Sequence, residues 1–217
     1  MAQITKFFEA APISGNKPDK LVIFLHGYGS NGKDLIGLAT EFAKVLPNAH
    51  FISPNAPFEF EGFIHDGYQW FSLSSYDPKL IYPQIIEANN ILDQFINSQL
   101  KRFNLEHKDL ILTGFSQGSM MSMYNSLRSG DKFGGILAYS GKLILPTSLG
   151  EVIGSKPRMC LVHGTHDSVL PHDHMIEAKD LLEKIEVPHE VHSIEGLDHG
   201  INSSGIKIGM SFLEKIV

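Results

Sequence analysis

The sequence predicts an α/β fold with a mainly parallel central sheet and helices on both faces. From residue 21 onward, short apolar runs alternate with stretches of helical periodicity. These runs are almost continuously apolar, which is typical of parallel strands buried on both faces. Hydrophobic residues make up 42% and charged residues 19% of the 217 positions, a composition that suits a globular protein with a sizeable core. No repeat or linker divides the chain, so we expect a single domain over residues 1–217 with little or no cap domain.

The expected elements follow one another in order along the chain. Strands are expected at residues 21–25, 50–53, 109–113, 134–140, 158–164 and 190–194. Helices are expected at residues 33–45, 84–101, 117–129, 174–186 and 204–216. The aromatic-rich segment 54–82 has neither period, and so long a connection usually serves function. In a doubly wound sheet the ligand site lies at the carboxyl ends of the strands, so we expect functional residues in the loops after them.

Composition and charge exclude several functional classes. The formal net charge is −6 and no long basic block is present, so a nucleic-acid partner is not expected. The single cysteine, Cys160, cannot form an intrachain disulfide, which fits a reducing compartment. Residues 1–14 do not form a signal or transit peptide, and no apolar run approaches 18 residues. We therefore expect a cytoplasmic protein with no transmembrane segment.

A catalytic serine is predicted at the end of the strand 109–113. The residues Gly-Phe-Ser-Gln-Gly around Ser116 match the G-x-S-x-G motif, in which a sharp strand-to-helix turn exposes the serine. A serine nucleophile needs a histidine base and an orienting acid, in the chain order serine, acid, histidine. Asp167 and His199 follow two later strands in that order. Asp198 and Asp173 are rival acids. An orienting carboxylate normally comes from a different strand loop than the histidine, which favours Asp167 over Asp198, and Asp173 lies further into the loop or the start of the next helix.

The glycine-rich loop after the first predicted strand supplies a second element of the site. Its G-x-G-x-x-G pattern from Gly27 to Gly32 lacks the acid that a dinucleotide site needs about 20 residues later, and Asp34 stands where a phosphate-binding P-loop has a hydroxyl. The loop instead suits an oxyanion hole, with the backbone N–H groups of Tyr28 and Gln117 as donors. His172-Asp173-His174 could suggest a metal site, but no complete ligand set of recognisable spacing is present, so neither a metal nor a cofactor is expected.

An ordered set of motifs resembles the phospholipase/carboxylesterase family of α/β-hydrolases, which includes acyl-protein thioesterases and small bacterial carboxylesterases. In chain order the motifs are FLHGYGSNGKD, PNAP, QWF, GFSQG, HGTHDSVLP and GLDHGI, from about residue 20 to the C-terminus. The resemblance implies the same roles for Ser116, Asp167 and His199 and the same two oxyanion donors. The chain departs from the family's usual residues at four positions, with Tyr28 for Leu, Ser30 and Ser72 for Asp, and Ser119 for Gly.

These observations predict a carboxylic ester hydrolase that cleaves esters or thioesters of short to medium acyl chains through an acyl-enzyme. Trp70, Phe71 and Leu73 are expected to bind the acyl chain, so Trp70→Ala should raise KM for longer chains. A small ester, a lysophospholipid and an acylated protein all remain candidate substrates, and the sequence leaves open whether the chain forms a homodimer. Alternatives are a non-catalytic binding protein on the same fold, and a lactone or carbon–carbon hydrolase on the same triad.

Overall fold

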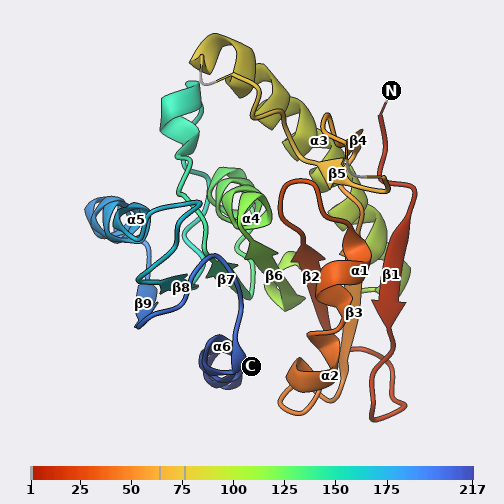
Figure 1. The fold of residues 1–217 in the computed structure, drawn as a ribbon. Coiled ribbons are helices and arrows are strands. Elements are labelled where there is room, and N and C mark those ends of the chain that lie inside the picture. Colours follow the sequence, from red (N-terminus) through yellow and green to blue (C-terminus); the bar gives the residue numbers. More distant parts are fainter. Residues whose placement is uncertain (1, 64, 76) are drawn as a thin grey trace.

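The central element of the protein is a seven-stranded sheet, seen in a computed structural model that describes residues 2–63, 65–75 and 77–217 (Figure 1). Its strands, in spatial order, are β1 (Phe7–Ala10), β3 (Ala49–Pro54), β2 (Lys20–Leu25), β6 (Leu110–Phe115), β7 (Gly135–Tyr139), β8 (Met159–Gly164) and β9 (His189–Ile194). β1 pairs antiparallel with β3, and all other neighbours are parallel. The predicted α/β class with a mainly parallel sheet is therefore confirmed.

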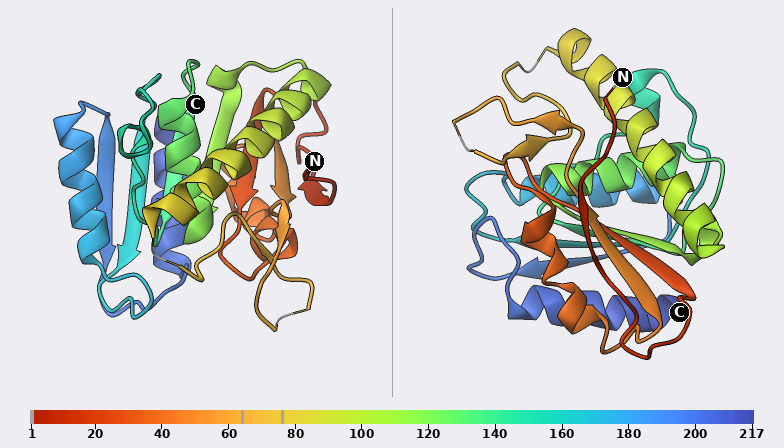
Figure 2. Two further views of the ribbon diagram at one scale, coloured as in Figure 1. Left: turned by 90° about the horizontal axis from the view of Figure 1, so that it is seen from above. Right: turned by 90° about the vertical axis from the view of Figure 1, so that its right-hand side faces the viewer.

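Helices cover both faces of this sheet. They are α1 (Gly32–Ile36), α2 (Ala39–Phe42), α3 (Pro78–Phe103), α4 (Gln117–Arg128), α5 (Asp173–Lys184) and α6 (Ser203–Ile216), with short 3-10 helices at His107–Asp109 and Pro146–Leu149. In the right-hand view of Figure 2, α6 and the short helices α1 and α2 lie on one side of the sheet, and α3 and α4 lie on the other. Within the described residues, no helix is both long and apolar enough to cross a membrane.

The strand β2 shows why residues 21–25 are all apolar. Leu21, Ile23 and Leu25 face the core that α3, α4 and α5 cover, whereas Val22 and Phe24 face the core under α1, α2 and α6. All five side chains are fully buried. Because successive side chains of a strand point to opposite faces, a strand covered on both sides is mostly apolar along its length.

Two predicted helices differ from the structure. The expected helix 33–45 is divided into α1 and α2 around Gly37, a residue with low helix propensity, and hydrogen bonds of the i to i+3 type span the break. The helix expected at 84–101 begins earlier, at Pro78, because the Asp77 side chain caps it by accepting from the Lys79 N–H at 3.0 Å. It ends at Phe103, and the C-cap residue Asn104 adopts a left-handed conformation with φ of 56°.

The long connection 54–82 contains a small hairpin apart from the main sheet. Its strands β4 (Phe58–Glu59) and β5 (Tyr68–Gln69) pair antiparallel. An isolated bridge between Ser30 and Tyr68 joins the hairpin to the loop after β2. The aromatic-rich connection therefore lies at the carboxyl edge of the sheet, where the predicted site residues also lie.

Candidate active site

A cavity of about 880 Å³ opens at the carboxyl edge of the sheet. Among the residues that line it are Ser116, from the turn after β6, and His199, from the loop after β9. Most of its wall is apolar. The apolar lining residues include Phe71, Leu73, Ile81, Tyr82, Ile85, Phe115, Met120, Leu143, Ile144, Leu145, Val169, Leu170 and Leu181. Such a cavity suits a hydrocarbon chain that ends at a reacting polar group.

The turn that carries Ser116 is sharp and strained. Ser116 has φ of 54° and ψ of −117°, a conformation that non-glycine residues rarely adopt, and it stands between β6 and the first residue of α4. Gly118 is required by close packing, because a Cβ there would lie 1.9 Å from the Leu25 carbonyl oxygen. Gly114 faces the same constraint, since its Cβ would lie 2.4 Å from the backbone of Gly118. These contacts allow α4 to pack directly against β2 and place the serine at the edge of the cavity.

Asp167 and His199, from the loops after β8 and β9, form a short hydrogen bond of 2.7 Å between His199 Nδ1 and Asp167 Oδ2. The other carboxylate oxygen accepts from the N–H groups of Val169 at 3.0 Å and Leu170 at 2.7 Å. Burial raises the pKa of Asp167, but the hydrogen bonds from His199 and the backbone outweigh burial and hold the pKa below its usual value. The acid is thus a carboxylate at neutral pH, and it fixes the proton of His199 on Nδ1.

Asp198, one rival acid, binds backbone rather than the imidazole. Its Oδ1 accepts from the N–H and the hydroxyl of Ser168 and from the N–H of His199, each at 2.8 Å. Asp198 therefore ties the loop after β8 to the loop after β9. Asp173, the other rival, is the first residue of α5. Of the three carboxylates, Asp167 is the one hydrogen-bonded to the His199 ring.

The loop after β2 is held by a buried neutral histidine. His26 Nε2 accepts from the Ala56 N–H at 2.9 Å, so its proton is on Nδ1, which donates to the Gly27 carbonyl at 2.8 Å. Burial lowers the pKa of His26 to about 4. The Trp70 indole N–H donates to the His26 carbonyl at 3.0 Å. These bonds fix the backbone that leads into Tyr28, a residue that lines the cavity.

Gln117, the second predicted oxyanion residue, has a further role in its side chain. Its amide oxygen accepts from the backbone N–H of Trp70 at 2.9 Å, and its amide nitrogen donates to the Phe71 carbonyl at 2.7 Å. As the first residue of α4, Gln117 has an N–H that the helix leaves without an intrahelical acceptor. The side chain thus fastens one cavity wall directly to the serine turn, a contact between distant segments that the sequence did not indicate.

The three residues predicted to bind the acyl chain separate into two groups. Phe71 and Leu73 line the cavity. Trp70 is fully buried and does not belong to the lining, because its ring packs behind the wall near His26, with ring centroids 5.9 Å apart. The structure therefore gives Trp70 a supporting position rather than a substrate contact.

The histidines of the segment 163–174 have separate hydrogen-bond partners. His163 Nε2 donates to the Leu170 carbonyl at 2.8 Å and lies 3.1 Å from Asp167 Oδ2. Burial lowers the pKa of His163, so the ring is neutral. His172 contacts the Ser193 hydroxyl at 2.8 Å, and His174 contacts a glutamate on α5 at 3.1 Å. Of these contacts, those of His163 support the loop that carries Asp167.

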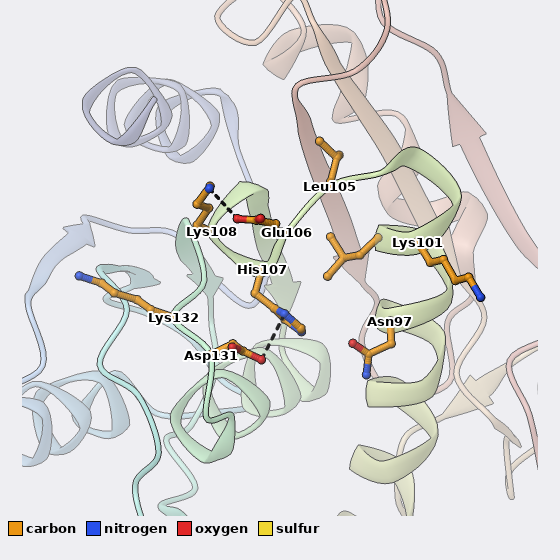
Figure 3. A pocket seen from close by; sticks show the side chains of 9 residues that line it. Asn97, Lys101, Leu105, Glu106, His107, Lys108, Asp131 and Lys132 are labelled. Carbon is orange, nitrogen blue, oxygen red and sulfur yellow. Dashed lines mark ion pairs between the residues drawn. The ribbon is translucent and has the colours of Figure 1, made fainter.

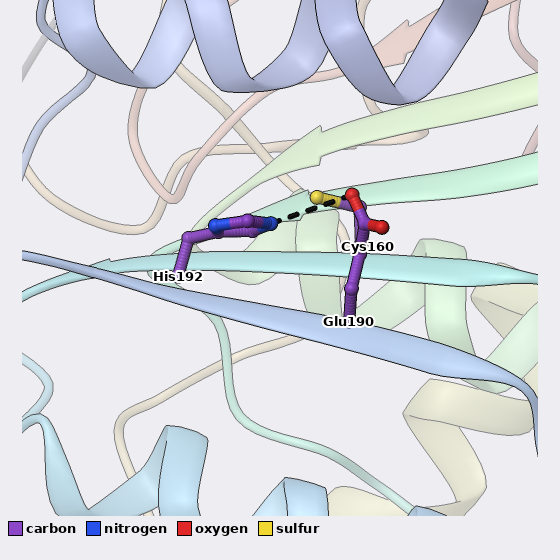
Figure 4. A group of neighbouring side chains, drawn as sticks. All are labelled: Cys160, Glu190 and His192. Carbon is purple, nitrogen blue, oxygen red and sulfur yellow. Dashed lines mark hydrogen bonds and ion pairs between the residues drawn. The ribbon is translucent and has the colours of Figure 1, made fainter. Parts of the chain in front are cut away.

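A different group of side chains, Cys160, Glu190 and His192, has the spacing of metal ligands (Figure 4). Their ligand atoms lie within 4.8 Å of one another on β8 and β9. Glu190, however, already pairs with Lys215 at 3.0 Å and with His192 at 3.3 Å. Burial raises the pKa of the Cys160 thiol, which opposes formation of the thiolate that a metal would need. The Glu190 carboxylate therefore already has partners in His192 and Lys215, and the three side chains lie outside the cavity lining.

A second cavity, of about 490 Å³, lies near the C-terminal end of α3 and the segments before β6 and β7 (Figure 3). Its wall includes two ion pairs, between Lys108 and Glu106 at 2.5 Å and between His107 and Asp131 at 3.3 Å. These pairs compensate part of the charge on the wall, which also includes Lys101 and Lys132.

The chain is similar to known proteins over nearly its whole length. The model of a family described as Phospholipase/Carboxylesterase matches residues 10–217. Acyl-protein thioesterase 1 homolog 1 of Dictyostelium discoideum is 28% identical over 207 residues, which cover 89% of each chain. Acyl-protein thioesterase 1 of Candida albicans is 25% identical over 222 residues, covering 95% of this chain and 96% of the yeast protein.

Solved structures share the fold over nearly the whole length. The crystal structure of esterase PE8 matches with a TM-score of 0.88 and 33% identity, covering 96% of this chain and 97% of the esterase. The Bacillus cereus carboxylesterase matches with a TM-score of 0.79 and 16% identity, covering 98% and 94% of the two chains. The latter likeness concerns the fold alone.

Proposed function

The chain belongs to the phospholipase/carboxylesterase family, and from this premise we propose that it cleaves ester or thioester bonds with Ser116 as nucleophile, His199 as base and Asp167 as orienting acid. Membership and the related esterases identify a carboxylic ester hydrolase. The observation that carries the assignment is the 2.7 Å hydrogen bond between His199 and Asp167, in a site where the strained Ser116 and His199 line the same apolar cavity.

The first half of the proposed reaction acylates the enzyme. Ser116 Oγ attacks the carbonyl carbon while its proton passes to His199 Nε2, and the carbonyl π electrons move to the oxygen. The oxyanion accepts hydrogen bonds from the N–H groups of Tyr28 and Gln117. When the intermediate collapses, the bond to the alcohol or thiol breaks, and the leaving group takes the proton from His199.

The second half regenerates the serine. Water attacks the acyl-enzyme as its proton passes to His199 Nε2, and the released Ser116 oxygen recovers a proton from the same nitrogen. Asp167 keeps the imidazole in the tautomer with hydrogen on Nδ1 and stabilises the imidazolium that forms. The His199 contact with Asp167 at 2.7 Å supports this role. The carboxylic acid then leaves, and the free enzyme is restored.

The cavity supports an acyl substrate of short to medium length. Phe71 and Leu73 contribute to an apolar wall in a space of about 880 Å³, which can bury a hydrocarbon chain. Several relatives are named acyl-protein thioesterase 1, and others are named esterases or carboxylesterases. We propose an acyl ester or acyl thioester as the substrate class, with an acylated protein, a lysophospholipid and a small ester as the members to be compared.

Intact mass after incubation with a fluorophosphonate tests the nucleophile. The wild type should gain one phosphonyl group as the serine oxygen displaces fluoride, and Ser116→Ala should gain none. Ser30→Ala is a matched control, because Ser30 also lines the cavity but its hydroxyl donates to Asp34 at 2.9 Å. Labelling of Ser116→Ala would refute the assignment, and a folded wild type without an adduct would favour a non-catalytic binding protein.

A further inference from the structure

Glu61 lies just after β4, and its carboxylate binds two segments that line the cavity. Oε1 accepts from the Tyr28 hydroxyl and, at 3.2 Å, from the Leu73 N–H. Oε2 accepts from the Ser72 hydroxyl at 2.6 Å. The hydrogen bonds from Ser72 and Tyr28 hold the pKa of Glu61 below its usual value, so the group is a carboxylate at neutral pH. Both cavity segments therefore meet at one negatively charged acceptor.

The loop that carries Tyr28 is docked on the β4–β5 hairpin through its backbone as well. The Gly29 N–H donates to the Tyr68 carbonyl at 2.9 Å, and the Tyr68 N–H donates to the Ser30 carbonyl at 2.7 Å. The rings of Tyr28 and Phe60 meet edge to face, with centroids 4.9 Å apart. The backbone contacts fix residues 29–30, whereas the ring contact and the bond to Glu61 fix Tyr28 itself.

The second of these cavity segments, residues 70–73, links the same carboxylate to Gln117. The Gln117 side chain binds the N–H of Trp70 and the carbonyl of Phe71, and the next two residues along the chain, Ser72 and Leu73, bind Glu61. A continuous path of hydrogen bonds and short backbone segments thus runs from Gln117 to Glu61, and from Glu61 to Tyr28. It connects the two residues proposed to supply the oxyanion donors.

We infer that Glu61 is a positioning residue, which holds Tyr28 so that its N–H stays aimed at the oxyanion formed on Ser116. The inference rests on the proposed function, because it assigns the oxyanion contact to Tyr28. Glu61 is exposed and does not belong to the cavity lining, so it acts through Tyr28 and the wall rather than on the substrate. A donor aimed at the oxyanion stabilises the transition state more than the bound ester, so misalignment of that donor lowers kcat more than it raises KM.

Glu61→Ala tests this role, with Glu59→Ala as the matched control. Glu59 is a carboxylate on β4 of the same hairpin, and it is paired through its backbone with Tyr68. Both variants are assayed with p-nitrophenyl acetate and p-nitrophenyl octanoate. We expect Glu61→Ala to lower kcat about tenfold on both esters, less than the roughly 100- to 1000-fold loss for a deleted donor, because the N–H remains but is less well held. KM should change less than about threefold.

Tyr28→Phe provides a second variant that removes the hydroxyl and leaves the backbone N–H. It should reproduce most of the loss in kcat, and Glu61→Ala combined with Tyr28→Phe should lose little more than either single variant, because both remove the same hydrogen bond. If Glu61→Ala melts at a much lower temperature than wild type, Tyr28→Phe carries the test.

Two results would overturn the inference. One is a kcat for Glu61→Ala within twofold of that for Glu59→Ala. The other is a rise in KM with unchanged kcat, which would assign Glu61 to the wall alone. Either result leaves the proposed function intact if Ser116→Ala is inactive, whereas an active Ser116→Ala refutes the proposed function itself.

Discussion

Replacing His26 with glutamine should make the stability of the protein less dependent on pH between about 6.5 and 4. His26 is fully buried, and its Nε2 accepts from the Ala56 N–H, so protonation of that nitrogen would replace an acceptor with a donor facing a donor. Burial lowers the pKa from 6.5 to about 4. As pH falls through this window, the unfolded chain takes up the proton before the folded protein does, and the free energy of unfolding decreases.

The size of this decrease follows from the two pKa values. At about 1.4 kcal/mol for each pH unit between them, His26 accounts for a loss of about 3 kcal/mol from pH 7 to pH 4. Glutamine does not titrate, and its amide oxygen can still accept from the Ala56 N–H. The variant should therefore lack this part of the decrease, whatever its stability at pH 7.

Urea unfolding at intervals from pH 7 to pH 4 measures the difference, with far-UV circular dichroism and the fluorescence of the single tryptophan, Trp70, as probes. His163 is also buried with a lowered pKa, but it is present in both proteins and its effect cancels. His166→Gln removes an exposed histidine and controls for the loss of one such side chain. A decrease in His26→Gln equal to that of wild type within about 1 kcal/mol would refute the assignment of His26 as a buried neutral ring.

Two further predictions concern the triad and the wall. Asp167→Asn should lower kcat by roughly four orders of magnitude, because the amide no longer selects the correct tautomer of His199. Asp198→Asn should lower kcat less than about fivefold, since its amide oxygen can accept the same backbone hydrogen bonds. Equal losses in steady-state assays of the two variants would contradict the choice of acid. Leu73→Ala should raise KM for octanoate esters more than for acetate esters, because Leu73 lines the cavity. Trp70→Ala should lower the free energy of unfolding by about 3–5 kcal/mol and change KM for both esters alike, because the Trp70 ring is buried behind the wall. A selective effect of Trp70→Ala on octanoate would restore the substrate contact expected from sequence.

Much of the fold could be predicted from local patterns. All six predicted strands occur within one or two residues of their expected bounds. Five of them are almost entirely buried, and a strand buried on both faces leaves a continuous apolar run, whereas β9 is only partly buried. The edge strand β1 was not predicted, since its four residues are only partly buried and carry no such run. The early start of α3 depends on a side-chain cap at Asp77, which lies before the apolar periodicity begins.

The residues of the candidate site could also be predicted from the sequence, whereas the contacts between them could not. The sequence indicated Ser116, Asp167 and His199 because each follows a strand, and parallel strands bring their carboxyl ends to one edge. The structure joins Asp167 to His199 and assigns Asp198 to backbone contacts. The catalytic roles of these residues remain predictions that the proposed variants test.

Tyr28 and Ser72 both differ from the family's usual residues, and in the structure they bind the same side chain. Both hydroxyls donate to Glu61, which the sequence did not single out. The sequence by itself determined six strands of the main sheet, the longer helices, their order and the strained serine turn, because these depend on residues close together in the chain. Only the tertiary structure decided which carboxylate meets His199, which aromatic ring faces the cavity and what Glu61 holds, because those contacts join distant segments whose relative positions are set by packing across the whole sheet.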